Sequence, residues 1–111
     1  MMIETERLLL RPPDDSDVDA WTAILSNPEV ARFLGPRLDS REAVAAHVQT
    51  ARERLAADGF GFLSVARKGD GRVLGRSGFL VWERRTWRPT TLREAAEHAE
   101  VEIGWALARD C

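Results

Sequence analysis

Two apolar runs joined by a short glycine-containing turn constrain the fold of this chain more than any other feature. Residues 60–67 (FGFLSVAR) and 73–82 (VLGRSGFLVW) have the length and the side chains of β-strands, and KGDG lies between them at 68–71. A glycine-containing turn between two such runs predicts an antiparallel hairpin. Gly75 and Gly78, inside the second run, predict a bulge or a close approach of another backbone.

Hydrophobic periodicity and capping residues predict the other elements. We expect a strand over 5–11, a helix over 16–26, a short helical turn in 28–35, a helix over 40–57, a short helix over 92–99 and a strand over 100–107. The expected N-caps are Ser16, Asp39 or Ser40, and Thr91. This order predicts an α+β fold, with helices laid against a mainly antiparallel sheet. The 111 residues are enough for one small domain and leave no room for two.

Composition and charge exclude several kinds of partner and site. Charged residues make up 31% of the chain, the formal net charge is −2, and no basic block stands out. We therefore expect neither nucleic acid nor a membrane as a partner. Cys111 is the only cysteine, which excludes an internal disulfide and a cysteine-based metal cluster, so we expect no metal site. No stretch reads as a signal peptide or a membrane span, and we expect a cytoplasmic protein.

Four stretches, taken in order, resemble the N-terminal part of the GCN5-related N-acetyltransferase (GNAT) family. They are TERLLLRP near the start, NPEVARFLG after the first helix, GFGFLSVARKGDGRVLGRSGF at the hairpin and EVEIGWALARD at the last strand. The resemblance is greatest to the branch that acetylates ribosomal-protein N-termini and related amines. It implies a GNAT-like fold and the acetyl-CoA-dependent transfer of an acetyl group to an amine, either a protein N-terminus or a small molecule.

The chain departs from the family's pattern after the last strand. In the family, that strand leads into a glycine-containing turn and a long helix, whose N–H groups hold the pyrophosphate of acetyl-CoA. Here residues 108–111 end the sequence, and no R-x-x-G-x-G/A pattern occurs in it. We therefore expect residues 1–111 to be a partial domain truncated after the fourth strand, with little or no activity and doubtful acetyl-CoA binding by itself.

Two other interpretations remain open for such a domain. The last strand alternates, with four apolar residues on one face: Val101, Ile103, Trp105 and Leu107. Without a covering helix, that face and the strand's free edge would invite pairing with another chain. The protein would then be a non-catalytic interaction module, a homodimer or a half-domain that pairs with a separately encoded C-terminal half. The third interpretation is a marginally folded remnant without a function.

The resemblance assigns chemistry to the last strand. Glu102 matches the carboxylate that takes a proton from the attacking amine in many relatives, and Glu100 lies two residues before it on the same face. A base of this kind needs a raised pKa, which partial burial or a neighbouring acid provides. Trp105, Ala106 and Leu107 match the stretch whose main-chain groups pair with the pantetheine arm of the cofactor. The alternatives are two solvated glutamates and a plain edge strand with a core tryptophan.

Phe33, Trp82 and Glu100 are the candidates for the acceptor site. Aromatic side chains supply apolar contact area for a substrate, although an aromatic residue belongs to the core more often than to a site. His47 is a lone histidine, which we expect to decorate a helix rather than to bind metal or act as a base.

Overall fold

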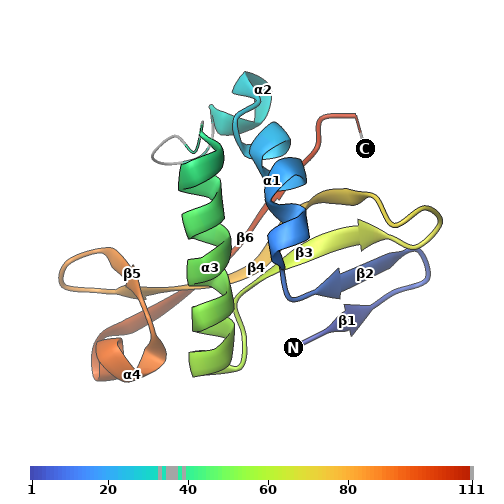
Figure 1. The fold of residues 1–111 in the computed structure, drawn as a ribbon. Helices are drawn as coiled ribbons and strands as arrows, with labels where there is room; N and C mark the ends of the chain where they lie inside the picture. The colour runs from blue at the N-terminus through green and yellow to red at the C-terminus, as the bar shows by residue number, and fades with distance from the viewer. Residues whose placement is uncertain (33, 35–37, 39, 111) are drawn as a thin grey trace.

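The computed structural model describes residues 1–32, 34, 38 and 40–110, and it confirms an α+β fold with a mainly antiparallel sheet (Figure 1). Within the described residues the strands are β1 (Ile3–Glu4), β2 (Leu8–Arg11), β3 (Phe62–Arg67), β4 (Val73–Glu83), β5 (Arg88–Thr90) and β6 (Ala99–Leu107). They form one sheet in the order β1-β2-β3-β4-β5, and β6 also pairs with β4. Every pairing is antiparallel.

Helices cover one face of this sheet. The described helical segments are η1 (Asp15–Asp17), α1 (Val18–Leu25), α2 (Pro28–Ala31), α3 (Arg41–Asp58), α4 (Leu92–Ala95) and η2 (Ala96–His98). Helices α1 and α3 contact each other and lie in front of β3, β4 and β6 in Figure 1. None of the described helices is long and apolar enough to cross a membrane.

The helix starts follow the expected chemistry at two of three places. Ser40 caps α3 by accepting a hydrogen bond from the Ala43 N–H at 3.1 Å. Thr91 caps α4 by accepting one from the Glu94 N–H at 3.3 Å. The cap expected at Ser16 is wrong, because η1 precedes α1 and Asp14 caps η1, in a capping box with Asp17. The alternative cap Asp39 lies outside the described residues.

The hairpin predicted from the KGDG turn is confirmed as β3 and β4. Consecutive residues Val65 and Ala66 oppose Gly75 and Val73, so the extra residue of a bulge is Leu74 of β4, next to Gly75, as predicted. Gly75 and Gly78 also mark close approaches: a Cβ on either would lie 2.0 Å from a carbonyl oxygen, that of Ala106 or Gly61 respectively. Both glycines have φ near +150°, at 154° and 153°, where other residues are strained.

Two details of the sheet differ from the sequence-based expectation. The strand expected over 5–11 begins only at Leu8, as β2, because the Thr5 side chain accepts a hydrogen bond from the Leu8 N–H at 3.0 Å and turns the chain. The strand β1, which precedes this turn, was not predicted. Residues 83–99 contain β5, which no periodicity predicted, since it has only three residues and folds back on β4. The short helix expected over 92–99 is divided into α4 and η2.

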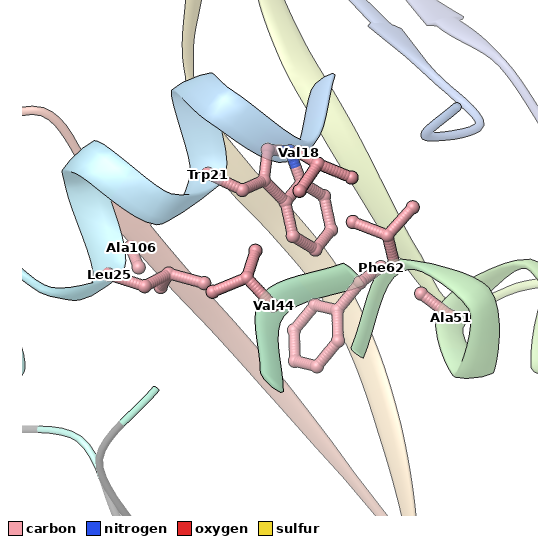
Figure 2. Packing of buried hydrophobic residues seen from close by; sticks show 8 residues of the cluster. Val18, Trp21, Leu25, Val44, Ala51, Phe62 and Ala106 are labelled. Atoms are coloured by element: carbon pink, nitrogen blue, oxygen red, sulfur yellow. The ribbon is translucent and has the colours of Figure 1, made fainter. Parts of the chain in front are cut away.

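The apolar core lies between the two long helices and the sheet (Figure 2). Its buried members are Val18, Trp21, Leu25, Val44, Val48, Ala51, Phe62 and Ala106. They come from α1, α3, β3 and β6, so the core joins the first helices to the last strand. Burial of such apolar area is the main stabilising contribution to a small domain.

One polar network is enclosed in this core. Arg11 donates to both carboxylate oxygens of Asp17, at 2.8 and 2.9 Å. Ser64 donates to Asp17 at 2.8 Å and accepts from the indole N–H of Trp21 at 3.0 Å, and the Asp14 N–H donates to Asp17 at 3.0 Å. Burial by itself raises the pKa of Asp17, but the hydrogen bonds from Arg11, Asp14 and Ser64 outweigh it and lower that pKa. We call these residues the Asp17 network.

The opposite face of β6 is exposed. Val101, Ile103, Trp105 and Leu107 have exposed fractions of 53%, 63%, 66% and 39%. The alternation expected from the sequence is therefore present, and in the described part of the chain it places four apolar side chains in solvent.

Candidate functional site

A cleft of about 580 Å³ opens on the helix-bearing face of the sheet, above β4 and β6. Its walls come from α1, α2 and α3 and from Leu34 and Leu38, and its floor comes mainly from β4 and β6. Among the lining residues are His47, Phe62, Arg76, Leu80, Trp82, Glu102, Gly104 and Trp105. An adjoining hollow of about 380 Å³ shares Trp82 and Glu102 with the cleft and adds Trp87, Glu100 and Val101.

The register of β4 against β6 determines the order of groups along the floor. The cross-strand pairs on this face are Arg76 with Ala106, Gly78 with Gly104, Leu80 with Glu102 and Trp82 with Glu100. Side chains of directly opposed residues project to the same face. The floor therefore has a basic end, a stretch without side chains at the glycine pair, and an acidic end with a tryptophan beside it.

At the basic end, Arg76 lies with its guanidinium carbon 4.2 Å from the ring centroid of Phe62. Burial lowers the pKa of Arg76 to about 10, and the charge of Glu102 opposes that shift. The side chain therefore stays cationic at neutral pH. Its Nε is buried and has no hydrogen-bond partner among the described residues.

His47 projects from α3 into the same end of the cleft. Its ring lies 5.8 Å from that of Trp21 and 6.1 Å from that of Phe62. Burial, followed by the nearby charges of Arg76 and Arg54, lowers the pKa of His47 to about 4, so the imidazole is neutral at pH 7. Its Nε2 is the second buried atom without a hydrogen-bond partner in the described part of the structure.

The structure places four of the seven residues predicted for the site at the cleft or at its adjoining hollow. Glu102, Trp82 and Trp105 line the cleft, and Glu100 lies in the hollow. Both glutamates are exposed, so the partial burial expected of a base is absent. Glu100 is not free there, since Arg84 lies 3.4 Å from its carboxylate. Trp87 borders the same hollow and is 61% exposed. Phe33 lies outside the described residues.

The three residues predicted to hold the pantetheine arm differ in what they offer. The Ala108 N–H donates to the Leu74 carbonyl at 2.7 Å, so Ala108 faces β4. Main-chain groups alternate between the two edges of an antiparallel strand. Trp105 and Leu107 therefore direct theirs away from β4, to an edge with no strand beside it among the described residues. Ala106 directs its own to β4, and its side chain is buried in the core.

Two residues of the cleft were missed by the sequence-based reasoning. His47 does more than decorate a helix, and its position three residues after Val44 puts it on the apolar face of α3. Arg76 is the only charged residue in the run 73–82, and that isolation between two glycines was the available signal. Only the tertiary structure shows that the two side chains meet. No group of three or more potential metal ligands occurs among the described residues.

Solved structures share this fold. A Bordetella pertussis protein assigned to the GnaT acetyltransferase family matches with a TM-score of 0.70 at 22% identity, over 99% of this chain and 60% of its own. A GNAT-family acetyltransferase from Bacillus anthracis matches with a TM-score of 0.71 at 20% identity, over 100% of this chain and 55% of its own. An Agrobacterium tumefaciens acetyltransferase matches with a TM-score of 0.69 at 20% identity, over 98% of this chain and 55% of its own. This chain thus spans 55–60% of the length of these proteins.

The sequence itself carries the assignment to a family. No curated protein matches the chain. The family model for the acetyltransferase (GNAT) domain matches residues 7–111, which is nearly the whole chain. The branch that acts on ribosomal-protein N-termini is not singled out by this match. On this match, the chain belongs to the GNAT family of acetyltransferases.

Proposed function

We propose that this protein takes part in the transfer of an acetyl group from acetyl-CoA to an amine, with Glu102 as the general base. One observation carries the proposal: Glu102 lines the cleft from β6, the strand whose outer edge carries the free main-chain groups of Trp105 and Leu107. An acceptor in the cleft and a cofactor along that edge would therefore meet next to one carboxylate.

Acetyl-CoA supplies the acetyl group as a thioester. An amine attacks the thioester carbon only in its neutral form, so a base that removes its proton favours the reaction. Glu102 is suited to this step, because its carboxylate lies beside Gly104 on the open floor of the cleft, where a Cβ on Gly104 would come within 3.8 Å of it. Glu102 takes the proton that the ammonium group loses before attack. The nitrogen–carbon bond then forms, the carbon–sulfur bond breaks, and the proton that the nitrogen loses after attack goes to the departing CoA thiolate.

The edge of β6 fits the pantetheine arm, because an extended amide-containing chain pairs with free strand N–H and C=O groups as another strand does. Trp105 and Leu107 supply those groups. Ala106 contributes its main-chain groups to the β4 ladder instead, and supports the edge from the core.

The first test is a thermal melt of the chain with and without millimolar acetyl-CoA. A ligand that binds only the folded state stabilises it, so a rise in Tm would support the β6 edge as a cofactor site. No rise would agree with the expectation that residues 1–111 bind acetyl-CoA poorly by themselves. Leu107→Pro removes one outward N–H, and proline is tolerated at the free side of an edge strand. This variant should keep its own melting transition and lose the rise.

Val101→Pro is the matched control, because it removes an outward N–H six residues earlier on the same edge. It should keep the rise in Tm. Equal loss of the rise in both variants would indicate a general distortion of β6, and an unchanged rise in Leu107→Pro would exclude the proposed pairing.

The second test concerns the base. Since little or no activity is expected of residues 1–111 alone, the rate is measured in a longer chain that also contains the family's glycine-containing turn and the helix after it. There Glu102→Gln should lower the rate of acetyl transfer to primary amines by a factor of about 100 or more, without changing the effect of acetyl-CoA on Tm. Glu100→Gln is the control, since Glu100 is paired with Arg84 outside the cleft. Equal rates for Glu102→Gln and the unmodified chain would remove Glu102 from the mechanism. The acceptor, a protein N-terminus or a small molecule, and a cytoplasmic location stay predictions.

The exposed apolar face of β6 favours a second function, as an interaction module. Four apolar side chains that are 39–66% exposed form a surface of the kind that marks contact with another protein. A homodimer would cover this surface in both copies, and a complementing C-terminal half would cover it in one. Sedimentation velocity over a hundredfold range of concentration tests the homodimer, and a monomer at every concentration would contradict it.

A further inference from the structure

The basic end of the cleft holds a cation that no carboxylate contacts directly within the described residues, although the charge of Glu102 acts on it from the acidic end. Among the described residues no carboxylate forms a salt bridge with Arg76, whose contact is the face of Phe62 at 4.2 Å. The Nε of Arg76 and the Nε2 of His47 are the two buried side-chain atoms without a hydrogen bond in that part of the chain. Arg76 and His47 both line one cleft, and within it these two atoms are covered by the protein. A buried polar atom without a partner is unfavourable, so its presence calls for an explanation such as an absent ligand.

The acidic end lies along the same floor. Glu102 is four residues before Ala106, the partner of Arg76, so the two charged residues are about 13 Å apart along the strands at about 3.3 Å per residue. Both side chains are long enough to shorten the gap between their charges. The Gly78–Gly104 pair lies between them, and a Cβ built on Gly104 meets only the Glu102 carboxylate, at 3.8 Å. This stretch of floor is therefore open.

The walls between the two ends are apolar. Leu80 and Trp82 extend β4 beyond the glycine pair, and Leu34 and Leu38 face them from the segment between α2 and α3. A short hydrocarbon chain fits such surroundings, whereas a second charge between the two ends would lose its hydration without compensation.

We propose that the acceptor is an amine that also carries a carboxylate, with the carboxylate at Arg76 and His47, the amine at Glu102, and the carbon chain over the Gly78–Gly104 pair. This inference rests on the proposed acetyl transfer for the role of the amine. Arg76 is a specificity-determining residue in this scheme, because a guanidinium forms charge-assisted hydrogen bonds with a carboxylate. His47 is neutral and donates one hydrogen bond to the same group.

Calorimetry of the 111-residue chain with defined probes tests the inference without acetyl-CoA. The probes are 4-aminobutyrate, 6-aminohexanoate and 8-aminooctanoate, which differ in the distance between amine and carboxylate. We expect one of them to bind most tightly, and its methyl ester, which lacks the negative charge, to bind about 10–100-fold more weakly. If no probe binds at millimolar concentration, or if the ester binds as well as the acid, the inference is wrong.

Variants locate the carboxylate. Arg76→Gln should weaken the acid about 10–100-fold and leave the ester unchanged, and Arg76→Lys should restore part of the difference. Gly104→Val, which fills the open floor, should weaken both. A purely structural role of Arg76 would instead change the melting temperature and both affinities together. Since the ester comparison needs no substitution, it holds even if a variant fails to fold.

Two further outcomes are informative. Tighter binding of 3-aminopropylphosphonate than of 4-aminobutyrate would contradict the choice of a carboxylate and identify the site as one for a tetrahedral anion.

The acetyl-CoA melt and the amino-acid calorimetry together separate this inference from the proposed function. If acetyl-CoA raises Tm through the β6 edge but no amino acid binds, the acceptor class alone is wrong. If amino acids bind through Arg76 but acetyl-CoA does not, the anion site stands and the transferase proposal fails.

Discussion

Two arginines show opposite uses of a buried charge in this fold. Arg11 is paired with Asp17 through two hydrogen bonds, and these bonds raise the pKa of Arg11. Arg76 lies on a phenylalanine ring with an unpaired Nε, and burial lowers its pKa to about 10. In the first region every polar group has found a partner within the chain. In the second, no carboxylate of the described residues forms a salt bridge with the guanidinium, and the proposed carboxylate of the acceptor would be its partner.

The polar groups of the Asp17 network and those of the cleft differ in their hydrogen bonds rather than in their burial. The Asp17 network joins β2, η1, α1 and β3, so it helps to specify how these elements meet. The cleft joins α3, β4 and β6 with polar atoms left over. A fully satisfied network rigidifies a core, and an incompletely satisfied one has the capacity to bind.

The largest expected effect is that of breaking the Asp17 network. Arg11→Met should lower the free energy of unfolding by about 3–5 kcal/mol, because it leaves a buried carboxylate without its cation. Urea denaturation at pH 7 measures this loss. The lowered pKa of Asp17 stabilises the fold above its ordinary value of 3.8 and ceases to do so as pH falls further, so the difference between the two proteins should narrow in acid. A loss below 1 kcal/mol at pH 7 would show that Asp17 is better solvated than its burial indicates.

The second effect concerns His47 and pH. The unfolded chain binds a proton on this imidazole near pH 6.5, and the folded chain does so only near pH 4. Stability is therefore lost as pH falls through this range, by about 1–2 kcal/mol between pH 6.5 and 5. Denaturation at several pH values measures the slope, and His47→Gln should flatten it. A slope that persists in the variant would assign the effect to other groups.

At the basic end of the cleft, the substitution that matches Arg11→Met is Arg76→Met, and it should have a smaller effect on the free energy of unfolding. Arg76→Met keeps the apolar contact with Phe62 and removes the unpaired charge, so the free energy of unfolding should change by about 1 kcal/mol or less, or rise. The same urea denaturation as for Arg11→Met provides the direct comparison. A loss as large as that of Arg11→Met would erase the distinction between the two regions.

The smallest effect is expected at the floor of the cleft. Gly104→Ala places its Cβ in open space and should stabilise the chain by about 0.4–1 kcal/mol, because it restricts the unfolded state. Gly78→Ala is the matched control on the opposing strand. There the Cβ would lie 2.0 Å from the Gly61 carbonyl oxygen at φ 153°, so we expect a loss of about 1–3 kcal/mol for the backbone conformation alone. Thermal melts of the pair should therefore shift in opposite directions.

Local patterns were sufficient for most of the fold. The β3–β4 hairpin, the capped helix α3 and the alternation of β6 each depend on residues close together in the sequence, and each was predictable. The failures were also local in cause. The prediction of Ser16 as a cap failed because Asp14, two residues earlier, accepts a hydrogen bond from the Ser16 N–H and caps the helical turn there. The strand β5 is too short to show a period, and its pairing depends on a turn that brings it back to β4.

The sequence by itself determined the fold class, because strand alternation, capping and turn chemistry act over a few residues. Its resemblance to the GNAT family supplied the family and, as a prediction, the candidate base Glu102. Only the tertiary structure decided which polar groups are satisfied. Asp17 and Ser64 are 47 residues apart, and they meet because η1 and β3 pack together. His47 and Arg76 meet in the same way across α3 and β4. Whether a charge is paired or left open depends on such distant contacts, and no local pattern in a sequence records them.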